Sequence, residues 1–274
     1  MSIILKTFKA KQVMEGAGVL VNRVFGYYET KDFDPFLMLD YFETKGQSES
    51  PGFPWHPHKG IETITYFVRG SGAHEDSMGN KGIIGPGELQ WMTAGKGIYH
   101  KEMPGSSPDG YQGFQFWVNL PQKEKLVTPS YKYIKKGEMK SYHTDGVEVK
   151  VIAGTYHDIV GPIDKSNLGI SMFHVVLEKG KTIELTRQVN KEGYVFVFEG
   201  KGTIDKDNIE MVTAYTLGEG TFKITSKNKM QFIYAEGAPL NEPIVWKGPI
   251  VMNTREEIEQ TFQDLNNGTF LKDE

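Results

Sequence analysis

Short apolar runs alternate with turn residues along almost the whole chain. The clearest runs cover residues 61–68, 112–120, 147–152, 173–177, 194–198, 222–225 and 230–234. They are rich in β-branched and aromatic residues, and Gly, Pro, Asn or Asp stands between them, which is typical of strands in a sandwich or barrel. No helical pattern alternates with these runs. The sequence therefore predicts an all-β fold and argues against a parallel sheet built from βαβ units.

The C-terminal end is the one place where the pattern predicts a helix. Thr254 and Glu257 have the spacing of a capping box. Apolar residues follow at i, i+4 and i+7, which places them on one face of a helix. They are Ile258, Phe262 and Leu265. Gly268 is a suitable stop, so we expect a helix over 254–267 that packs on the body of the protein.

The chain also contains an internal echo. ITYFVRGSG (64–72) resembles YVFVFEGKG (194–202), and a Gly-rich turn follows each, at 85–88 and 217–220. Two echoes in the same order and at matching separation indicate a duplicated β domain. We expect a first barrel over residues 1–135, a polar linker near 135–145, a second barrel over 145–245, and a tail with the helix over 246–274.

Composition removes several classes of protein. The chain has 274 residues, with 31 Lys+Arg, 35 Asp+Glu and no cysteine. Disulfides, zinc fingers, iron–sulfur clusters and thiol nucleophiles are therefore excluded. A net charge of −4 without a basic block argues against direct nucleic-acid binding. We find no run of eighteen apolar residues and no secretory signal pattern, so we expect a cytosolic protein without a membrane span.

Two His pairs carry the candidate chemistry. His56 and His58 stand at i and i+2, and so do His100 and Glu102. Alternate side chains of a strand point to the same face, so each pair can converge on one ion. If the two segments lie side by side in a barrel, these four residues form a site with three nitrogens and one oxygen. Such donors suit a divalent first-row metal and leave positions for water, substrate or dioxygen.

Other polar residues leave alternatives open. Strand parity also carries Gly60 and Glu62 to the face of His56 and His58, so Glu62 competes with Glu102 as the carboxylate ligand or supports the site from outside it. For His74, the simpler interpretation is a loop residue that forms a hydrogen bond with Asp76 or Ser77. The isolated histidines are expected to bind no metal. They are His143, His157 and His174.

Several phrases resemble the pirin family of the cupin superfamily. HPHKGIET is followed by GPGELQWMTAGKGIYHKEMP, and LQWMTAGKGIYHKEMP (89–104) is close to a family signature. Supporting phrases cover nearly the whole chain: FDPFLMLDYF (33–42), AHEDSMGN (73–80) and GPIVMNTREEI (248–258). The resemblance implies two jelly-roll cupin barrels packed face to face and a C-terminal helix.

The resemblance also assigns the site. It implies that His56, His58, His100 and Glu102 bind one metal ion per chain, that Glu62 does not, and that the ion is iron, Fe(II), among the divalent metals these donors allow. In the second half, matching glycines place Thr186 and Gln188 opposite the HPH histidines. Ile233 and Ala235 fall opposite His100 and Glu102. With no imidazole there, we expect the second barrel to lack metal.

The resemblance implies two classes of function. Some pirins are similar to quercetin 2,3-dioxygenase, which opens a flavonol ring with O₂ and releases carbon monoxide; Glu102 would then also act as general base. Apolar side chains near the motifs would line a pocket or fill the core: Phe53, Trp55, Trp91, Met103, Phe114 and Phe116. The alternative is a redox-sensing regulator that acts through protein partners, either a transcription cofactor or a modulator of a metabolic enzyme. A related metal-dependent oxygenase or isomerase with another small substrate is a third candidate, and we expect a monomer.

Overall fold

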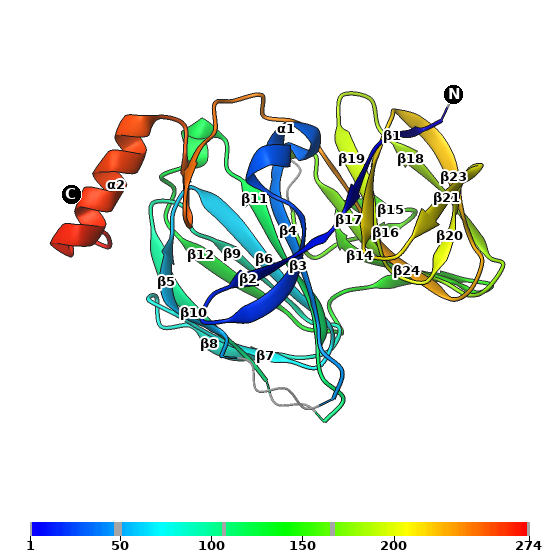
Figure 1. The fold of residues 1–274 in the computed structure, drawn as a ribbon, viewed down its shortest axis with the longest axis horizontal. Coiled ribbons are helices and arrows are strands. Elements are labelled where there is room, and N and C mark those ends of the chain that lie inside the picture. The colour runs from blue at the N-terminus through cyan, green and yellow to red at the C-terminus, as the bar shows by residue number, and fades with distance from the viewer. Residues whose placement is uncertain (1, 47–50, 106–107, 165–167, 273–274) are drawn as a thin grey trace. The chain divides into compact units, whose positions relative to one another are not determined.

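The computed structural model describes residues 2–46, 51–105, 108–164 and 168–272 (Figure 1). The chain folds into two compact units. The first barrel comprises Gln12–Arg23, Phe36–Lys136 and Leu240–Glu274. The second barrel comprises Met1–Lys11, Val24–Pro35 and Gly137–Pro239.

The first barrel has two antiparallel sheets. The seven-stranded sheet has the order β12-β9-β6-β11-β4-β3-β2. Its strands are β2 (Lys11–Glu15), β3 (Val19–Phe25), β4 (Phe36–Glu43), β6 (Ile61–Arg69), β9 (Leu89–Thr93), β11 (Gln112–Asn119) and β12 (Ser130–Ile134). The four-stranded sheet, β5-β10-β7-β8, contains β5 (Phe53–His58), β7 (Gly72–Asp76), β8 (Lys81–Ile84) and β10 (Ile98–Pro104). A short 3-10 helix η2 (Gln122–Glu124), a hairpin of β25 (Val245–Lys247) and β26 (Ile250–Met252), and α2 (Arg255–Asn267) complete it.

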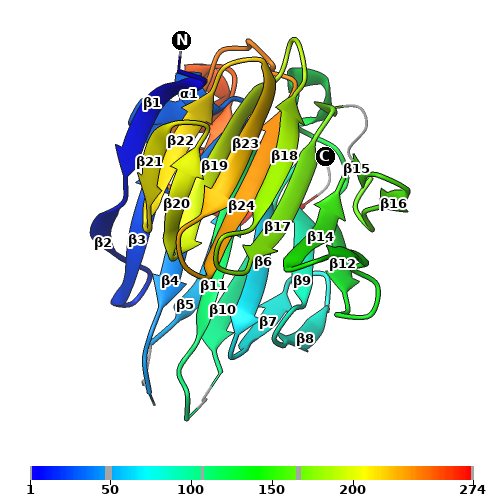
Figure 2. The same cartoon turned by 90° about the vertical axis from the view of Figure 1, so that its right-hand side faces the viewer.

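The second barrel repeats this plan. Its seven-stranded sheet has the order β1-β22-β19-β24-β17-β14-β13 and its four-stranded sheet the order β18-β23-β20-β21 (Figure 2). The larger sheet contains β1 (Ile4–Lys9), β13 (Ser141–Thr144), β14 (Val147–Ala153), β17 (Ser171–Leu177), β19 (Glu192–Glu199), β22 (Thr213–Leu217) and β24 (Met230–Gly237). The smaller contains β18 (Thr182–Arg187), β20 (Lys201–Ile204), β21 (Asp207–Glu210) and β23 (Gly220–Ser226). Short elements are η1 (Tyr27–Glu29), α1 (Thr30–Phe33), β15 (Thr155–Tyr156) and β16 (Ile159–Val160).

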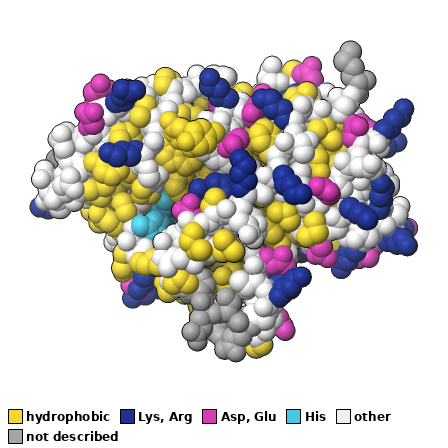
Figure 3. All heavy atoms as spheres, viewed as in Figure 1, with side chains coloured by type: hydrophobic (Ala, Val, Ile, Leu, Met, Phe, Trp, Pro, Cys, Tyr) yellow, Lys and Arg dark blue, Asp and Glu magenta, His cyan; other side chains and the backbone are white. Residues whose placement is uncertain are grey.

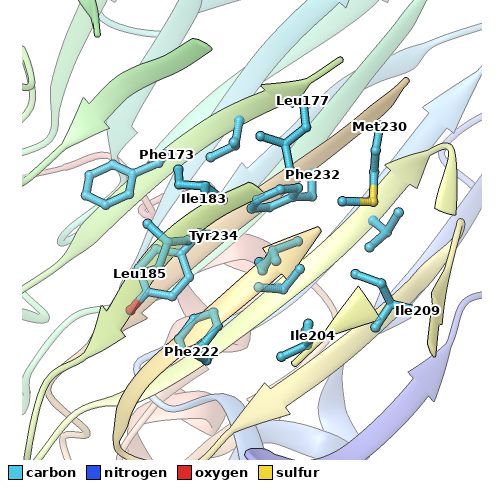
Figure 4. Close-up of a cluster of buried hydrophobic side chains, with 14 of the residues drawn as sticks. Phe173, Leu177, Ile183, Leu185, Ile204, Ile209, Phe222, Met230, Phe232 and Tyr234 are labelled. Carbon is cyan, nitrogen blue, oxygen red and sulfur yellow. The ribbon is translucent and has the colours of Figure 1, made fainter. Parts of the chain in front are cut away.

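The core of the second barrel lies between its two sheets. Strand β18 shows the reason, because its exposed and buried residues alternate and Ile183 and Leu185 point inward. They meet Phe232 and Tyr234 from the other sheet in one apolar cluster (Figure 4). The interior of this barrel is therefore filled with hydrocarbon and aromatic side chains.

The internal echo corresponds to equivalent strands. β6 lies between β9 and β11, and β19 lies between β22 and β24, at the same places in the two sheet orders. The second part of the echo does not join equivalent turns. The turn at 85–88 precedes β9, whereas the turn at 217–220 follows β22, which is the counterpart of β9. The next strand is β23, so β23 and not β24 is the counterpart of β10. Ile233 and Ala235 therefore do not occupy the positions of His100 and Glu102. The inward side chains of β23 are Phe222, Ile224 and Ser226, none of them an imidazole.

The predicted helix is confirmed. α2 begins after Thr254, whose side chain accepts a hydrogen bond from the Glu257 amide, and the Glu257 side chain completes the capping box. It ends at Gly268, which adopts the left-handed conformation with φ of 68°. Ile258 packs with Ile250 and Met252 of β26, so the helix is fixed to the first barrel. Among the described residues no helix has the length and apolarity that a membrane crossing needs.

Candidate metal centre

Strands β5 and β10 bring the two predicted His pairs together. The strands are antiparallel neighbours, and His56 lies directly opposite His100. On its other side β10 pairs with β7, where Glu102 faces His74 and His100 faces Asp76. The register shifts between His100 and Glu102 against β5. The condition that the two segments lie side by side is therefore met.

Three imidazoles converge on one point. The Nε2 atoms of His56 and His58 are 3.2 Å apart, and those of His56 and His100 are 2.8 Å apart. The other nitrogen of His56 donates a hydrogen bond to the Pro54 carbonyl at 2.7 Å, and that of His58 donates to the Pro249 carbonyl at 3.0 Å. Because a carbonyl only accepts, the neutral rings carry their protons on Nδ1. Their Nε2 lone pairs then face each other.

This donor set fits a metal ion. Facing lone pairs at such distances repel one another unless a cation lies between them, and neutral imidazole Nε2 is a common ligand of first-row metals. Hydrogen bonds from Nδ1 to backbone carbonyls are also the usual way in which ligating histidines are oriented. The three rings could therefore hold a divalent cation with the protons of His56 and His58 left where they are.

Burial keeps the inner rings neutral. His58 and His100 are 2% and 0% exposed. Loss of hydration lowers the pKa of His58 to about 3, and the neighbouring ring of His56 acts in the same direction. The pKa of His100 is likewise lowered well below its usual value, first by burial and then by the rings of His58 and His56. Neutral rings are the form that binds metal.

Glu102 lies beside this cluster and is held by other side chains. Its Oε1 accepts hydrogen bonds from Thr65 Oγ1 at 2.7 Å and from Gln90 Nε2 at 3.0 Å. A carboxylate oxygen of Glu102 also lies within 4.8 Å of ring nitrogens of His74 and His100, which makes a second group of potential ligands. The two groups share His100, so Glu102 is adjacent to the three-histidine cluster.

Glu62 does not lie on the face of His56 and His58, contrary to the prediction from side-chain alternation along a single strand. Strand β5 ends at His58, and Gly60 has a φ of 77° that breaks the extended chain before β6 begins. The count of alternating faces therefore does not continue across this turn. Glu62 is buried within the other sheet, where Thr93 Oγ1 donates a hydrogen bond to its Oε1 at 2.6 Å. It belongs to neither group of potential ligands among the described residues.

His74 is the residue that the sequence reasoning placed wrongly. It lies on β7 and not in a loop, because the strand continues to Asp76, and it is 3% exposed. The expected bond to Asp76 is present, with His74 Nε2 at 3.2 Å from Asp76 Oδ2. Its nearness to His100 and Glu102 follows from the pairing of β7 with β10. The motif AHEDS has the i, i+2 spacing of the other pairs, and this was the only signal available.

The remaining histidines lie apart from this centre. His143 and His157 are exposed in the second barrel, and His157 stacks on Tyr142. His174 is buried on β17, with Nε2 at 2.9 Å from Gln231 Oε1. None of the three belongs to a group of potential metal ligands among the described residues.

The apolar residues near the motifs divide into two sets. Trp91, Phe114 and Phe116 are buried in the core of the first barrel. Trp55 and Met103 are 48% and 38% exposed on β5 and β10, and Phe53 lies near the His56 ring. Figure 3 shows histidine surface beside hydrophobic side chains over these strands. Trp55 and Met103 alternate with His56 and Glu102 along their strands, so their side chains point to the outer face of this sheet.

Comparisons with known proteins agree with this architecture. The family model Pirin matches residues 18–118, and the Pirin C-terminal cupin domain matches residues 172–271. A pirin-like protein of Caulobacter vibrioides is 39% identical, over 97% of this chain and 98% of its own. The crystal structure of a quercetin 2,3-dioxygenase from Acinetobacter baumannii is 32% identical, with a TM-score of 0.91 and coverage of 98% of both chains.

A bacterial pirin from Escherichia coli, solved in complex with nickel(II), has a TM-score of 0.69 at 20% identity and covers 85% of this chain and 99% of its own. At that identity the likeness supports the fold alone. The family models and the Caulobacter relative together span both barrels, so the two cupin domains are confirmed. The chain belongs to the pirin family.

Proposed function

We propose that His56, His58, His100 and Glu102 bind one divalent metal ion, iron, and that the protein is an oxygenase of the quercetin 2,3-dioxygenase type. The observation that carries the site is the convergence of three Nε2 atoms, in which His56 and His58 have their Nδ1 protons engaged by backbone carbonyls. The quercetin 2,3-dioxygenase of Acinetobacter baumannii, which has this fold at 32% identity, supports the reaction class.

Glu102 has the surroundings of a proton acceptor as well as a ligand. Gln90 donates to Oε1, and the Thr65 hydroxyl, which lies 2.7 Å from both Glu102 Oε1 and Gln115 Oε1, contacts the same oxygen. These contacts hold Oε1 and leave Oε2 to take a proton from the hydroxyl of a flavonol. A positioned carboxylate of this kind contributes roughly 10²–10⁴-fold to a rate. The metal, when bound, orients the flavonol oxygen and O₂ and stabilises negative charge.

The exposed side chains of Trp55 and Met103 lie on the outer face of β5 and β10, because they alternate with the histidines and with Glu102 along these strands. Lys101 lies over the Trp55 ring at 5.2 Å from its centroid. We infer that the substrate contacts the face that carries the histidines and not this outer face. The three-histidine end of the cluster, where His56 is partly exposed, is the side from which the substrate approaches.

The test is metal analysis of protein purified without added metal or chelator, with O₂ uptake and carbon monoxide release measured on quercetin. We expect about one iron per chain with turnover, and loss of both in His56→Ala, because that change removes one of three nitrogen donors. His143→Ala is the matched control, since this exposed imidazole lies in the second barrel, and it should retain both. Assays after reconstitution with Fe(II) and with Ni(II) identify the metal.

Two carboxylate variants test the fourth ligand. Glu102→Gln should weaken metal binding and abolish uptake, whereas Glu62→Gln should retain the metal. The reverse result would exchange the two roles. Bound iron without uptake on quercetin would leave the site but favour another substrate or the regulatory role. Full activity of His56→Ala would refute the ligand set.

A further inference from the structure

Two ring nitrogens beside the centre are buried without a partner. Within the described part of the chain, neither His74 Nδ1 nor His100 Nδ1 has a hydrogen bond. Both side chains are buried, at 3% and 0% exposure. Buried polar atoms are almost always paired, so two unpaired nitrogens on neighbouring side chains require an explanation.

The tautomer of His74 follows from Asp76. The His74 Nε2 atom is 3.2 Å from Asp76 Oδ2, and a carboxylate only accepts, so the neutral ring carries its proton on Nε2. Asp76 is itself fixed, because the Met78 amide, the Asn80 amide and the Asn80 side chain all donate to it. In this neutral tautomer His74 Nδ1 presents a lone pair.

The tautomer of His100 is the complement. Its Nε2 faces the Nε2 of His56 at 2.8 Å, and as a metal ligand this nitrogen must offer its lone pair. Its proton then lies on Nδ1. Ring nitrogens of His74 and His100 lie within 4.8 Å of each other, in one group with a Glu102 oxygen. A buried donor on His100 and a buried acceptor on His74, each unpaired, thus lie on neighbouring rings whose centroids are 5.5 Å apart.

We propose that Asp76 and His74 are a positioning pair for His100, in which His74 Nδ1 accepts the hydrogen bond of His100 Nδ1–H. This inference rests on the proposed function. The rings of His56 and His58 have backbone carbonyls in this role, and His100 uses a carboxylate-bound imidazole instead. Such a partner fixes the orientation of the ligating ring and makes it a stronger donor. His74 is thereby a positioning residue and not a fourth nitrogen ligand.

Three substitutions of His74 distinguish the loss of the hydrogen-bond acceptor from the loss of the ring's volume. His74→Asn retains an acceptor atom where Nδ1 stands, and His74→Gln replaces the Nε2 side that bonds Asp76. His74→Phe removes both nitrogens but retains the stack on Tyr131, whose ring lies 4.8 Å away. The readouts are the affinity for Co(II) in competition with a chelator and the visible absorption of the Co(II)-loaded protein. Thermal unfolding of the metal-free proteins checks the fold.

We expect the affinity to fall about 10–100-fold in His74→Phe and His74→Gln, as for other partners of ligating histidines, with an altered Co(II) spectrum. His74→Asn should restore most of the affinity. Wild-type affinity and spectrum in His74→Phe, or equal loss in His74→Asn and His74→Gln, would overturn the inference. If His74→Phe does not fold, the Asn and Gln pair decides. Failure of the wild-type chain to bind Co(II) would instead refute the proposed metal centre.

Discussion

The histidines of this chain differ because of what lies within reach of each ring. The Nε2 atoms of His56, His58 and His100 face one another, at 3.2 Å between His56 and His58 and 2.8 Å between His56 and His100. The His174 ring instead has the Gln231 side-chain amide as a hydrogen-bonding partner. A buried ring with a hydrogen-bonding side chain beside it has a structural role, whereas a set of rings whose Nε2 atoms face one another is suited to a cation.

His174 makes the second barrel sensitive to acid. Burial lowers the pKa of its ring to about 3, with the charge of Lys150 acting in the same direction. In the unfolded chain the ring takes up a proton near pH 6.5, and in the folded chain it does not. The unfolded state therefore binds more protons between pH 6.5 and 3, so stability falls as the pH falls through this window, by about 1.4 kcal/mol per pH unit for one group.

The measurement is urea unfolding of metal-free protein at pH 7 and at pH 5, followed by probes in the second barrel. The His174→Gln variant should show a weaker loss on acidification than the wild-type chain. His143→Gln, at an exposed position of the same barrel, is the control and should lose as much as the wild-type chain. Equal losses in all three would contradict the assignment.

The residue pattern predicted the candidate ligands but not the groups that orient them. HPH and HKE are visible in the sequence because ligands on a strand must alternate. The partners of those candidate ligands are not visible in the sequence. The Pro249 carbonyl is far from His58 in the sequence, and His74 reaches His100 only because β7 pairs with β10.

At the scale of elements, strand β26 contacts the turn at Gly60 and in this way supports the candidate metal centre. The Val251 amide donates to the Lys59 carbonyl, and the buried Lys125 ammonium donates to the carbonyls of both Gly60 and Val251. Asn119 Oδ1 accepts the third hydrogen bond of Lys125 at 2.6 Å. These contacts hold the segment that places the Pro249 carbonyl against His58.

Gly60→Ala should disturb this junction. Gly60 has a φ of 77°, and a Cβ there would overlap the Val251 carbonyl oxygen. We expect a loss of about 1–3 kcal/mol from the strained backbone alone, together with weaker metal binding, because β26 must move and take Pro249 with it. Differential scanning calorimetry and chelator competition measure the two effects.

Gly248→Ala provides the comparison. Gly248 also has a positive φ, 56°, but nothing lies within 4 Å of an added Cβ. Gly248→Ala should lower the stability through the strained backbone, with little change in metal affinity. If both variants bind metal as the wild-type chain does, β26 does not position His58.

The strand and helix elements themselves were largely predictable. The predicted runs at 61–68 and 194–198 correspond to β6 and β19, and the capping box marks the start of α2. Local pattern sufficed because alternation and capping act over a few residues. The misaligned turn at 217–220 shows the limit, since several Gly-rich turns fit one short motif and only pairing distinguishes them.

At the scale of the molecule, β1 belongs to the sheet of the second barrel. It pairs with β22 from Lys9 opposite Thr213 to Ile4 opposite Leu217. In the first barrel β12 holds the equivalent edge position beside β9. Residues at the N-terminus thus cover an edge that would otherwise present unpaired backbone groups.

Deletion of residues 2–9 should therefore weaken the second barrel. Hydrogen exchange in β22 is the measurement, and we expect the protection of amides that bond to β1 to fall by about tenfold or more, since each lost hydrogen bond contributes roughly 0.5–1.5 kcal/mol. The amides of β9, whose partner β12 stays in place, are the internal control. Unchanged protection of β22 would show that β1 contributes nothing to this edge.

The sequence by itself determined the class of fold, the duplication, the C-terminal helix and the two His-containing motifs, because all of these depend on short periodicities and local capping. Tertiary structure decided which chemistry those motifs acquire. Pairing of β5, β10 and β7 sets which nitrogens face one another and brings His74 to His100. The turn at Gly60 sends Glu62 into the other sheet. These outcomes depend on contacts between distant segments, and no local pattern encodes the register in which two strands meet.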